Sequence, residues 1–266
     1  MASIGEQTNA DGDEQYGFVF QGDNEELLMH LAMNNGLPYR MTEDGITWND
    51  ERILETLTFI RDLIDDGIMP RETAAIDPHK RMELYYNYQA LFFGRAIPYF
   101  DPTVANRNQD IDDGVETGEK LDFVLLPIPH HEGEEQVAVG GSEGYLLFTQ
   151  RGASEEHIAN SMKVLEHLTG ADAAGMAASQ LALPIIHEEA IGKYELPLAD
   201  YNEEAAEILA SHVLAKAEIP SELATKDDEY RAEVVVPTFQ GLLAGELTPE
   251  EAYETLKTRG EALVTD

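Results

Sequence analysis

Residues 48–67 read WNDERILETLTFIRDLIDDG, from Trp48 to Gly67, and predict an amphipathic helix. The large apolar residues of this stretch recur every three or four positions and so fall on one helical face: Ile53, Leu57, Ile60 and Ile64. Asn49 is a typical residue for the N-terminal cap of such a helix, and Gly67 is a typical terminator. Leu, Ile and Val at helical spacing supply enough apolar surface to bury a core.

Short strand patterns alternate with helices on both sides of this stretch. Tyr16–Phe20 predicts a strand, and Asn24 is expected to cap a helix that Gly36 ends. Further strands are expected at 95–100, 121–127, 135–139 and 145–149, and further helices at 81–93, 154–168, 172–181, 188–193, 202–214, 226–243 and 249–263. Thr248-Pro249-Glu250-Glu251 is a full capping box for the last helix. Short strands among many helices predict an α/β or α+β chain, with no internal repeat.

The chain is strongly negative. It contains 17 Lys and Arg and 52 Asp and Glu, for a formal net charge of −35 over 266 residues. This balance argues against nucleic acid and against anionic membrane surfaces as partners, because both are bound through Lys and Arg. Apolar residues make up 43% of the chain, so it is expected to fold, as one large domain or two smaller lobes. Molar salt would screen the self-repulsion, which favours a halophilic source.

The chain contains no cysteine, which excludes disulfides, thiolate metal sites and a lipidated cysteine within these residues. No apolar run approaches the length of a membrane span, and the first residues are polar and acidic, unlike a signal peptide. Residues 1–15 are expected to form a disordered leader. As written, the chain is therefore expected to be cytoplasmic.

The usual signatures of catalysis are missing from the sequence. Paired carboxylates are uninformative among 52 acidic residues, and His130-His131-Glu132 has no second histidine helix to complete a metal site. No nucleophile elbow, phosphate-binding loop or dinucleotide fingerprint is present. We therefore predict no enzyme activity, no metal and no cofactor.

Two loop segments have the composition of a sugar-binding site. Sugars are bound by aromatic faces together with carboxylates and backbone groups on loops that follow strands. The first segment supplies Tyr99, Phe100, Asp101 and Thr103, and the second supplies Gly140, Gly141, Ser142 and Glu143, where the glycines allow close approach of backbone to a ligand. The eight residues are the predicted ligand-binding set, and aromatic residues beside Gly and Asp also commonly serve as core and turn residues.

From residue 15 onward the order of motifs resembles the later part of the extracellular solute-binding proteins of sugar ABC importers, the group that includes maltose-binding protein. The similar segments are Trp48-Asn49-Asp50-Glu51, Phe93-Gly94-Arg95-Ala96-Ile97 before Asp101-Pro102, Phe123 to Pro129, Val139-Gly140-Gly141, Ala182-Leu183-Pro184 and Leu243 to Ala252. The resemblance implies a periplasmic-binding-protein-like (type II) bilobal α/β fold and sugar solute binding. It also implies ABC permease subunits as partners and a monomer.

This sequence departs from the family pattern at individual residues and in its length. Asp101 stands where the family often has Gly, and Thr103 where it often has Trp. Members of the family are longer, with an extracellular signal or lipid anchor and a first lobe ahead of the similar region. Residues 16–266 are therefore expected to be the C-terminal part of such a protein, with one main lobe plus helices of a largely missing N-terminal lobe. The resemblance implies that both predicted loops face the gap between lobes.

Two other classes of function stay open at this stage. One is a halophilic carbohydrate-active enzyme whose catalytic carboxylates are hidden in the acidic background. The other is a stand-alone interaction module that uses its helical half to bind a protein. Binding of a sugar without turnover would separate the solute-binding hypothesis from both.

Overall fold

The computed structural model of the chain describes residues 12–93, 100–121, 126–139, 147–148, 150–181, 189–190, 207, 213–215 and 223–265. Contacts between residues divide the chain into two compact units. The first unit comprises 1–95, 127–140 and 211–266, and the second comprises 96–126 and 141–210. The chain therefore passes from one unit to the other after Arg95, Leu126, Gly140 and Ala210.

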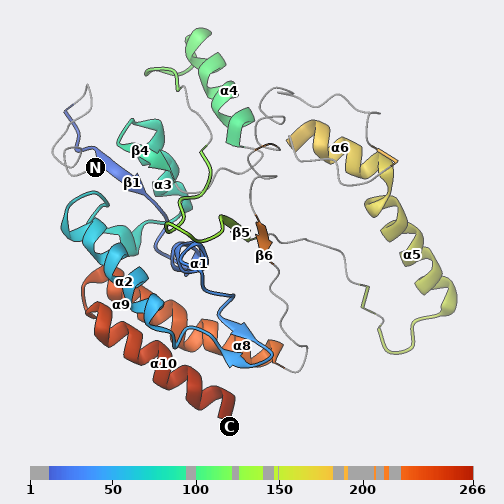
Figure 1. Cartoon of the computed structure of the whole chain (residues 1–266). Helices are drawn as coiled ribbons and strands as arrows, with labels where there is room; N and C mark the ends of the chain where they lie inside the picture. Colours follow the sequence, from blue (N-terminus) through green and yellow to red (C-terminus); the bar gives the residue numbers. More distant parts are fainter. Residues whose placement is uncertain are drawn as a thin grey trace. The chain divides into compact units, whose positions relative to one another are not determined.

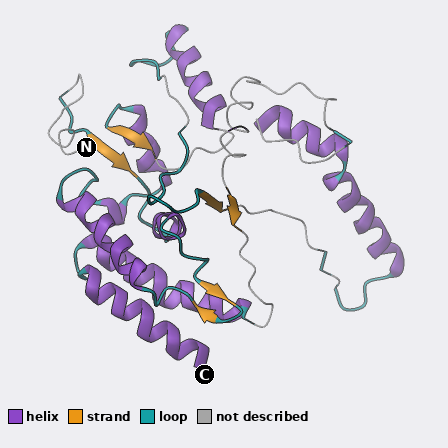
Figure 2. Cartoon of the chain, in the orientation of Figure 1, coloured by secondary structure: helices purple, strands orange, loops and turns teal. Residues whose placement is uncertain are grey.

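Among the described residues, the strands form three short pairs, two of which are parallel. β1 (Tyr16–Val19) pairs in parallel with β4 (Ala90–Phe93), and β5 (Val137–Val139) pairs in parallel with β6 (Val213–Ala215). β2 (Met41–Thr42) and β3 (Gly45–Ile46) form an antiparallel hairpin. Parallel strands require long crossovers, which here contain helices (Figure 2), so the predicted α/β class is confirmed.

Helices supply most of the first unit. They are α1 (Glu26–Asn34), α2 (Glu51–Asp65), α3 (Pro78–Tyr86), α8 (Ala224–Tyr230), α9 (Val236–Ala244) and α10 (Pro249–Thr265), with a 3₁₀ turn at Thr73–Ala75. A π-helical segment, Arg231–Val235, joins α8 to α9. In Figure 1, α2, α9 and α10 lie side by side, and α1 packs against α2.

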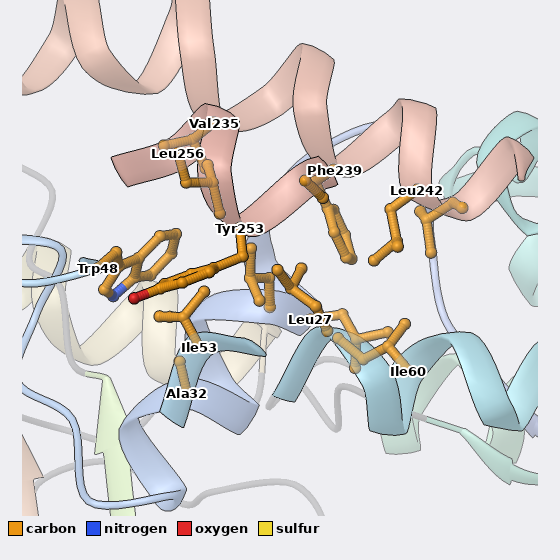
Figure 3. Packing of buried hydrophobic residues seen from close by; sticks show 14 of the residues in the cluster. Leu27, Ala32, Trp48, Ile53, Ile60, Val235, Phe239, Leu242, Tyr253 and Leu256 are labelled. Carbon is orange, nitrogen blue, oxygen red and sulfur yellow. The ribbon is translucent and has the colours of Figure 1, made fainter. Parts of the chain in front are cut away.

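The apolar faces of these helices meet in one core. Ile53, Leu57, Ile60 and Ile64, the residues predicted to share a helical face, are all buried within it. Trp48 and Phe239 are fully buried too. Figure 3 shows residues of α9 and α10 facing residues of α1 and α2 across this core. Each large side chain buried here contributes about 1.5–3 kcal/mol by removal from water.

Most helix ends follow their sequence signals, with two corrections at N-caps. The N-cap of α1 is Glu25 and not the predicted Asn24, although Asn24 Oδ1 accepts the Glu26 N–H at 3.0 Å. The Thr248 backbone N–H donates to Glu251 Oε2 at 3.0 Å and the Glu251 N–H donates to Thr248 Oγ1 at 3.2 Å, which confirms the capping box. The N-cap of α2 is Asp50 and not the predicted Asn49. Asp50 is the cap because its carboxylate accepts the Arg52 backbone N–H at 2.9 Å. Its negative charge also interacts favourably with the positive N-terminal end of the helix dipole.

The aromatic segment 81–93 was predicted as a single helix, which is confirmed as far as Tyr86 and wrong beyond it. α3 ends at Tyr86, Tyr88 adopts a positive φ of 56°, and the chain continues as β4. The strand prevails because Ala90 pairs with Tyr16 and both residues are buried together in a small cluster with Val19 and Leu84. Backbone pairing and burial thus override a run of residues at helical spacing.

The second unit contains α4 (Phe100–Asp112), α5 (Glu155–Thr169) and α6 (Ala171–Leu181). Ser154 caps α5 as predicted, since its hydroxyl accepts the His157 backbone N–H. The strand predicted at 145–149 does not appear at Leu147 or Phe148, which lie exposed in irregular chain. The helix predicted at 202–214 is wrong at its end, because 213–215 is β6 and pairs with β5.

Candidate functional site

Of the first predicted segment, the structure describes the backbone from Phe100 onward. Phe100, Asp101 and Thr103 all belong to the first turns of α4, so the structure brings these three together on one helix. The strand predicted at 95–100 is therefore wrong at Phe100, and the predicted loop residues Asp101 and Thr103 are helical, because α4 already begins at Phe100. Tyr99 lies outside the described residues.

α4 is tied to the loop that follows it, which fixes this helix in place. The Asn108 side chain donates to the Leu121 carbonyl at 2.7 Å and accepts the Leu121 N–H at 2.9 Å. Lys120 Nζ forms an ion pair with Asp112 at 2.5 Å. Val104, next to the predicted ligand residues, is buried. The helix that carries Asp101 is therefore anchored by contacts on its later turns.

The second predicted segment, Gly140 to Glu143, lies outside the described residues, but the strand that leads into it is described. β5 ends at Val139 and is held to α1 by Asn34, a residue that no motif in the sequence marks. Asn34 Oδ1 accepts the Val137 N–H at 2.8 Å, and Asn34 Nδ2 donates to the Val137 carbonyl at 2.9 Å. The buried Asn34 amide satisfies both backbone hydrogen-bonding groups of Val137, and it therefore fixes the end of β5 that leads to Gly140.

Both predicted segments lie beside points where the chain changes unit. Phe100 follows the passage after Arg95 by a few residues, and Gly140 is itself the last residue before another passage. That both segments face a gap between lobes stays a prediction.

Four charged side chains meet inside the first unit, and no motif in the sequence marks them. Arg40 Nη2 donates to Asp227 Oδ2 at 2.6 Å, and Arg40 Nη1 lies 3.5 Å from Glu25 Oε1. Arg231 Nε donates to the same Glu25 oxygen at 2.5 Å. The Arg40 guanidinium also lies over the Tyr39 ring, 4.5 Å from its centre. These charges sit at positions 25, 40, 227 and 231, so the ion pairs of Arg40 with Asp227 and of Arg231 with Glu25 join residues distant in the sequence.

Burial makes this charge cluster structurally demanding. The side chains of Glu25, Arg40 and Asp227 are at most 5% exposed. Within the described chain, Glu25 Oε2, Arg40 Nε and Asp227 Oδ1 are shielded from solvent and make no hydrogen bond. Burial raises the pKa of Asp227, an effect that the neighbouring Arg40 opposes. Such a cluster holds α1, the chain before β2 and α8 in one arrangement, because each unpaired charge would be costly.

Arg231 is the member of the cluster that reaches solvent, with 45% of its side chain exposed. Glu25 fixes its guanidinium from one side, and it begins the π-helical segment Arg231–Val235. Short π-helical segments are rare and are found frequently at functional sites. Arg231 is therefore a candidate donor to a polar ligand.

Other kinds of site find little support in the described part of the chain. No three His, Asp or Glu side chains there gather in a way that could hold a metal ion. A cavity of about 330 Å³ lies between α2 and the end of α9, lined by Arg61, Ile64, Asp65, Arg71 and Ala244. Its lining contains no aromatic ring, so it lacks the stacking surface expected of a sugar site. None of the helices described is long and apolar enough to cross a bilayer.

Comparison with known proteins gives a fold and no sequence relative. Neither a protein-family model nor a curated protein sequence matches the chain. Among solved structures, a maltose/maltodextrin-binding domain from Bdellovibrio bacteriovorus bound to maltotriose is similar, with 21% identity and a TM-score of 0.73. This match covers 100% of the present chain and 64% of the other.

Two further structures agree with it. Maltose-bound MalE3 of T. maritima has 19% identity and a TM-score of 0.70, covering 94% of the present chain and 61% of its own. An ABC transporter solute-binding protein from Thermotoga lettingae bound to α-D-tagatose has 17% identity and a TM-score of 0.67, covering 94% and 60%. The chain thus spans under two thirds of the length of these proteins. Its fold is the periplasmic-binding-protein-like (type II) fold of sugar-binding solute-binding proteins.

Proposed function

We propose that the chain binds a sugar or oligosaccharide as the solute-binding component, or the larger part of it, of an ABC-type importer. The observation that carries this proposal is the fold, which matches solved proteins named as bound to maltotriose, maltose and α-D-tagatose. The proposal includes ABC permease subunits as partners, an extracellular place of action and a monomeric state. The excess of carboxylates supports a halophilic setting for this activity.

The proposed ligand contacts are the two segments predicted from sequence, Tyr99 to Thr103 and Gly140 to Glu143. Their positions support the assignment, since Asp101 stands on the first turn of an anchored helix and Gly140 follows a strand fixed by Asn34. Asp101 and Glu143 would accept hydrogen bonds from sugar hydroxyls, and the backbone at Gly140 and Gly141 would donate them. Arg231 is added to this set as a donor of fixed orientation.

Titration calorimetry of the chain in molar KCl with maltose, maltotriose and tagatose tests the proposal. We expect heat of binding with at least one sugar and no consumption of that sugar on prolonged incubation. A hydrogen bond to a charged group contributes about 1.5–3 kcal/mol, so Asp101→Ala should weaken binding roughly ten- to a hundredfold. Asp113→Ala removes an exposed carboxylate just beyond the same helix and is the matched control.

One result would contradict the proposed function, and a second would contradict only the assignment of Asp101 to the site. Turnover of a sugar that one Asp or Glu substitution abolishes would establish a carbohydrate-active enzyme instead. Equal affinity of the parent and Asp101→Ala proteins would remove Asp101 from the site while leaving sugar binding itself intact.

A further inference from the structure

The cavity between α2 and the end of α9 contains two arginine side chains. Among the described residues it is lined by Arg61, Ile64, Asp65, Arg71 and Ala244, and its volume of about 330 Å³ is enough for a small molecule. Two guanidinium groups and one carboxylate leave this lining with a net charge of +1. The sign is opposite to that of the whole chain, which carries a net charge of −35.

Arg61 is held in a fixed orientation by the elements around it. Its Nε donates to both carboxylate oxygens of Asp65 at 3.1 Å, and its Nη2 donates to the same carboxylate. Its Nη1 donates to the carbonyls of Leu242 and Leu243 at 3.2 and 3.4 Å, so it also caps the C-terminal end of α9. Because each Nη atom carries two N–H groups, the second N–H of Nη2 makes no hydrogen bond to a described residue and can reach a ligand.

Gly245, the residue directly after α9, allows this placement of Arg61. Gly245 adopts a left-handed φ of 75°. A β-carbon at this position would lie 3.2 Å from Arg61 Nη1, a tighter contact than side chains usually make. The glycine therefore gives the guanidinium room to lie against the backbone. A side chain that is ordered before binding loses less conformational entropy when a ligand arrives.

Arg71 is the second cation of the cavity. It is exposed, and it forms no hydrogen bond or ion pair with any other residue that the structure describes. Its charge nevertheless acts on the carboxylate of the cavity. The pKa of Asp65 is lowered mainly by its hydrogen bonds from Arg61, and Arg71 lowers it further through its charge. Arg71 thus brings a guanidinium to the cavity without a protein anion to neutralise it.

The lining favours an anion over other classes of ligand. A cation would meet two guanidinium groups and a carboxylate that Arg61 already engages. A sugar would find no aromatic ring to stack on. Asp62, Asp66 and Glu72 are close in sequence, but they are not among the described residues that line the cavity. Arginine binds carboxylates and phosphates through paired N–H donors, and it does so better than lysine because its fork is planar and rigid.

We propose that this cavity binds a small molecule through a carboxylate or phosphate group that Arg61 and Arg71 hold between them. Arg61 supplies a donor of fixed orientation, and Arg71 supplies the unneutralised charge. The site uses none of the residues proposed to contact the sugar. The inference therefore goes beyond the proposed function and does not depend on which solute the protein binds.

Equilibrium dialysis in molar KCl with radiolabelled malonate and inorganic phosphate tests the proposal. We expect the parent chain to bind a single equivalent of at least one of the two anions. Arg71→Gln should weaken this binding by about tenfold or more, because it removes a charged hydrogen-bond donor. Since Arg71 has no partner among the described residues, the variant should fold like the parent. Arg259→Gln removes an exposed arginine from α10, changes the net charge equally and should bind like the parent.

Two further measurements sharpen the result. Arg71→Lys keeps the charge but loses the planar fork, so its affinity should lie between those of the parent and Arg71→Gln. Tighter binding of malonate would identify a carboxylate ligand, and tighter binding of phosphate would identify a phosphorylated one. Equal affinities of Arg71→Gln and Arg259→Gln would overturn the proposal, as would a parent chain that binds neither anion.

Sugar titrations of the same proteins keep this inference separate from the proposed function. Arg71→Gln should bind maltose, maltotriose or tagatose with the same affinity as the parent. Anion binding that depends on Arg71 would stand even if no sugar binds. Conversely, sugar binding without anion binding would contradict only the assignment of this cavity.

Discussion

The two units of this chain differ in how far they bury their apolar side chains. In the first unit, helices α1, α2, α9 and α10 enclose residues such as Trp48, Leu57 and Phe239, none of which is exposed. In the second unit, the buried hydrophobic residues described are Val104, Leu121 and Ala190, whereas most of the exposed large hydrophobic side chains belong to it: Val115, Leu126, Leu147, Phe148, Met162, Val164, Leu168 and Met176.

This difference shows that helical patterning and core formation are separate properties. α2 and α5 have the same length and similar caps, and each has its apolar residues on one face. α2 has buried residues because α1, α9 and α10 pack against it, and α5 has none within the described chain. A pattern creates a face that can be buried, and only a partner element buries it.

The largest expected effect is that of salt on the second unit. Lowering KCl from molar to a few tens of millimolar lengthens the Debye length and restores repulsion among about 35 net charges. We expect the melting temperature to fall substantially, with hydrogen exchange in α5 and α6 accelerating before exchange in α2 and α10. A melting temperature that does not depend on salt would show that the charges are spaced beyond mutual influence.

The second largest expected effect is the loss of stability on truncating an apolar side chain, which should differ between the two units. Phe239 is fully buried, so Phe239→Ala should lower the free energy of unfolding by about 3–5 kcal/mol. Met162→Ala removes an exposed side chain and should change it by no more than about 0.5 kcal/mol. Denaturant titration in molar KCl measures both. A comparable loss from both substitutions would mean that α5 is as well packed as α9 in the isolated chain.

Removing Arg40 tests the buried charge cluster of the first unit. Arg40→Met leaves Glu25 and Asp227 buried without their shared partner, and we expect a loss of about 3–5 kcal/mol at neutral pH. Adding Asp227→Asn to the Arg40→Met variant should recover part of the lost stability. The measurement is denaturant unfolding of the parent, single and double variants.

The stability of the Arg40→Met single variant should depend on pH in a characteristic way. Burial already holds the pKa of Asp227 above its ordinary value of 3.8, and loss of Arg40 raises that pKa further. The folded variant then binds a proton more readily than the unfolded one, so its stability falls as pH rises through the folded-state pKa and recovers on acidification toward 3.8. The deficit relative to the parent should therefore be smaller near pH 4 than at pH 7, and Asp227→Asn should abolish that trend. A deficit independent of pH would show that Asp227 is not the group responsible.

Helix caps give the smallest and most closely matched comparison. Thr248→Ala removes one half of the capping box of α10 and should cost about 1 kcal/mol in the main unfolding transition. Ser154→Ala removes the cap of α5, and we expect no measurable shift in that transition because α5 contributes no buried residue to it. Equal shifts for the two variants would show that the units unfold as one.

Local sequence determined the helix faces, several caps and the order of elements. Ile53, Leu57, Ile60 and Ile64 could be assigned to the core from spacing alone, and the pair Thr248 and Glu251 from its capping box, because these interactions link residues close in the chain. The motif order, by its resemblance to sugar-binding proteins, also led to the fold class that the solved structures share. Of the predicted site, the structure describes the backbone of Phe100, Asp101 and Thr103, which lie in the first turns of α4.

Tertiary structure decided what depends on residues distant in sequence. Residues 90–93 became a strand because β1, more than seventy residues earlier, offers a pairing edge, and 213–215 became a strand because β5 does the same. Arg40 and Asp227 form an ion pair across 187 positions, and Asn34 holds Val137 across 103. Backbone pairing and burial of charge outweigh local propensity, since each involves free energies larger than the tenths of a kcal/mol per residue that distinguish one secondary structure from another.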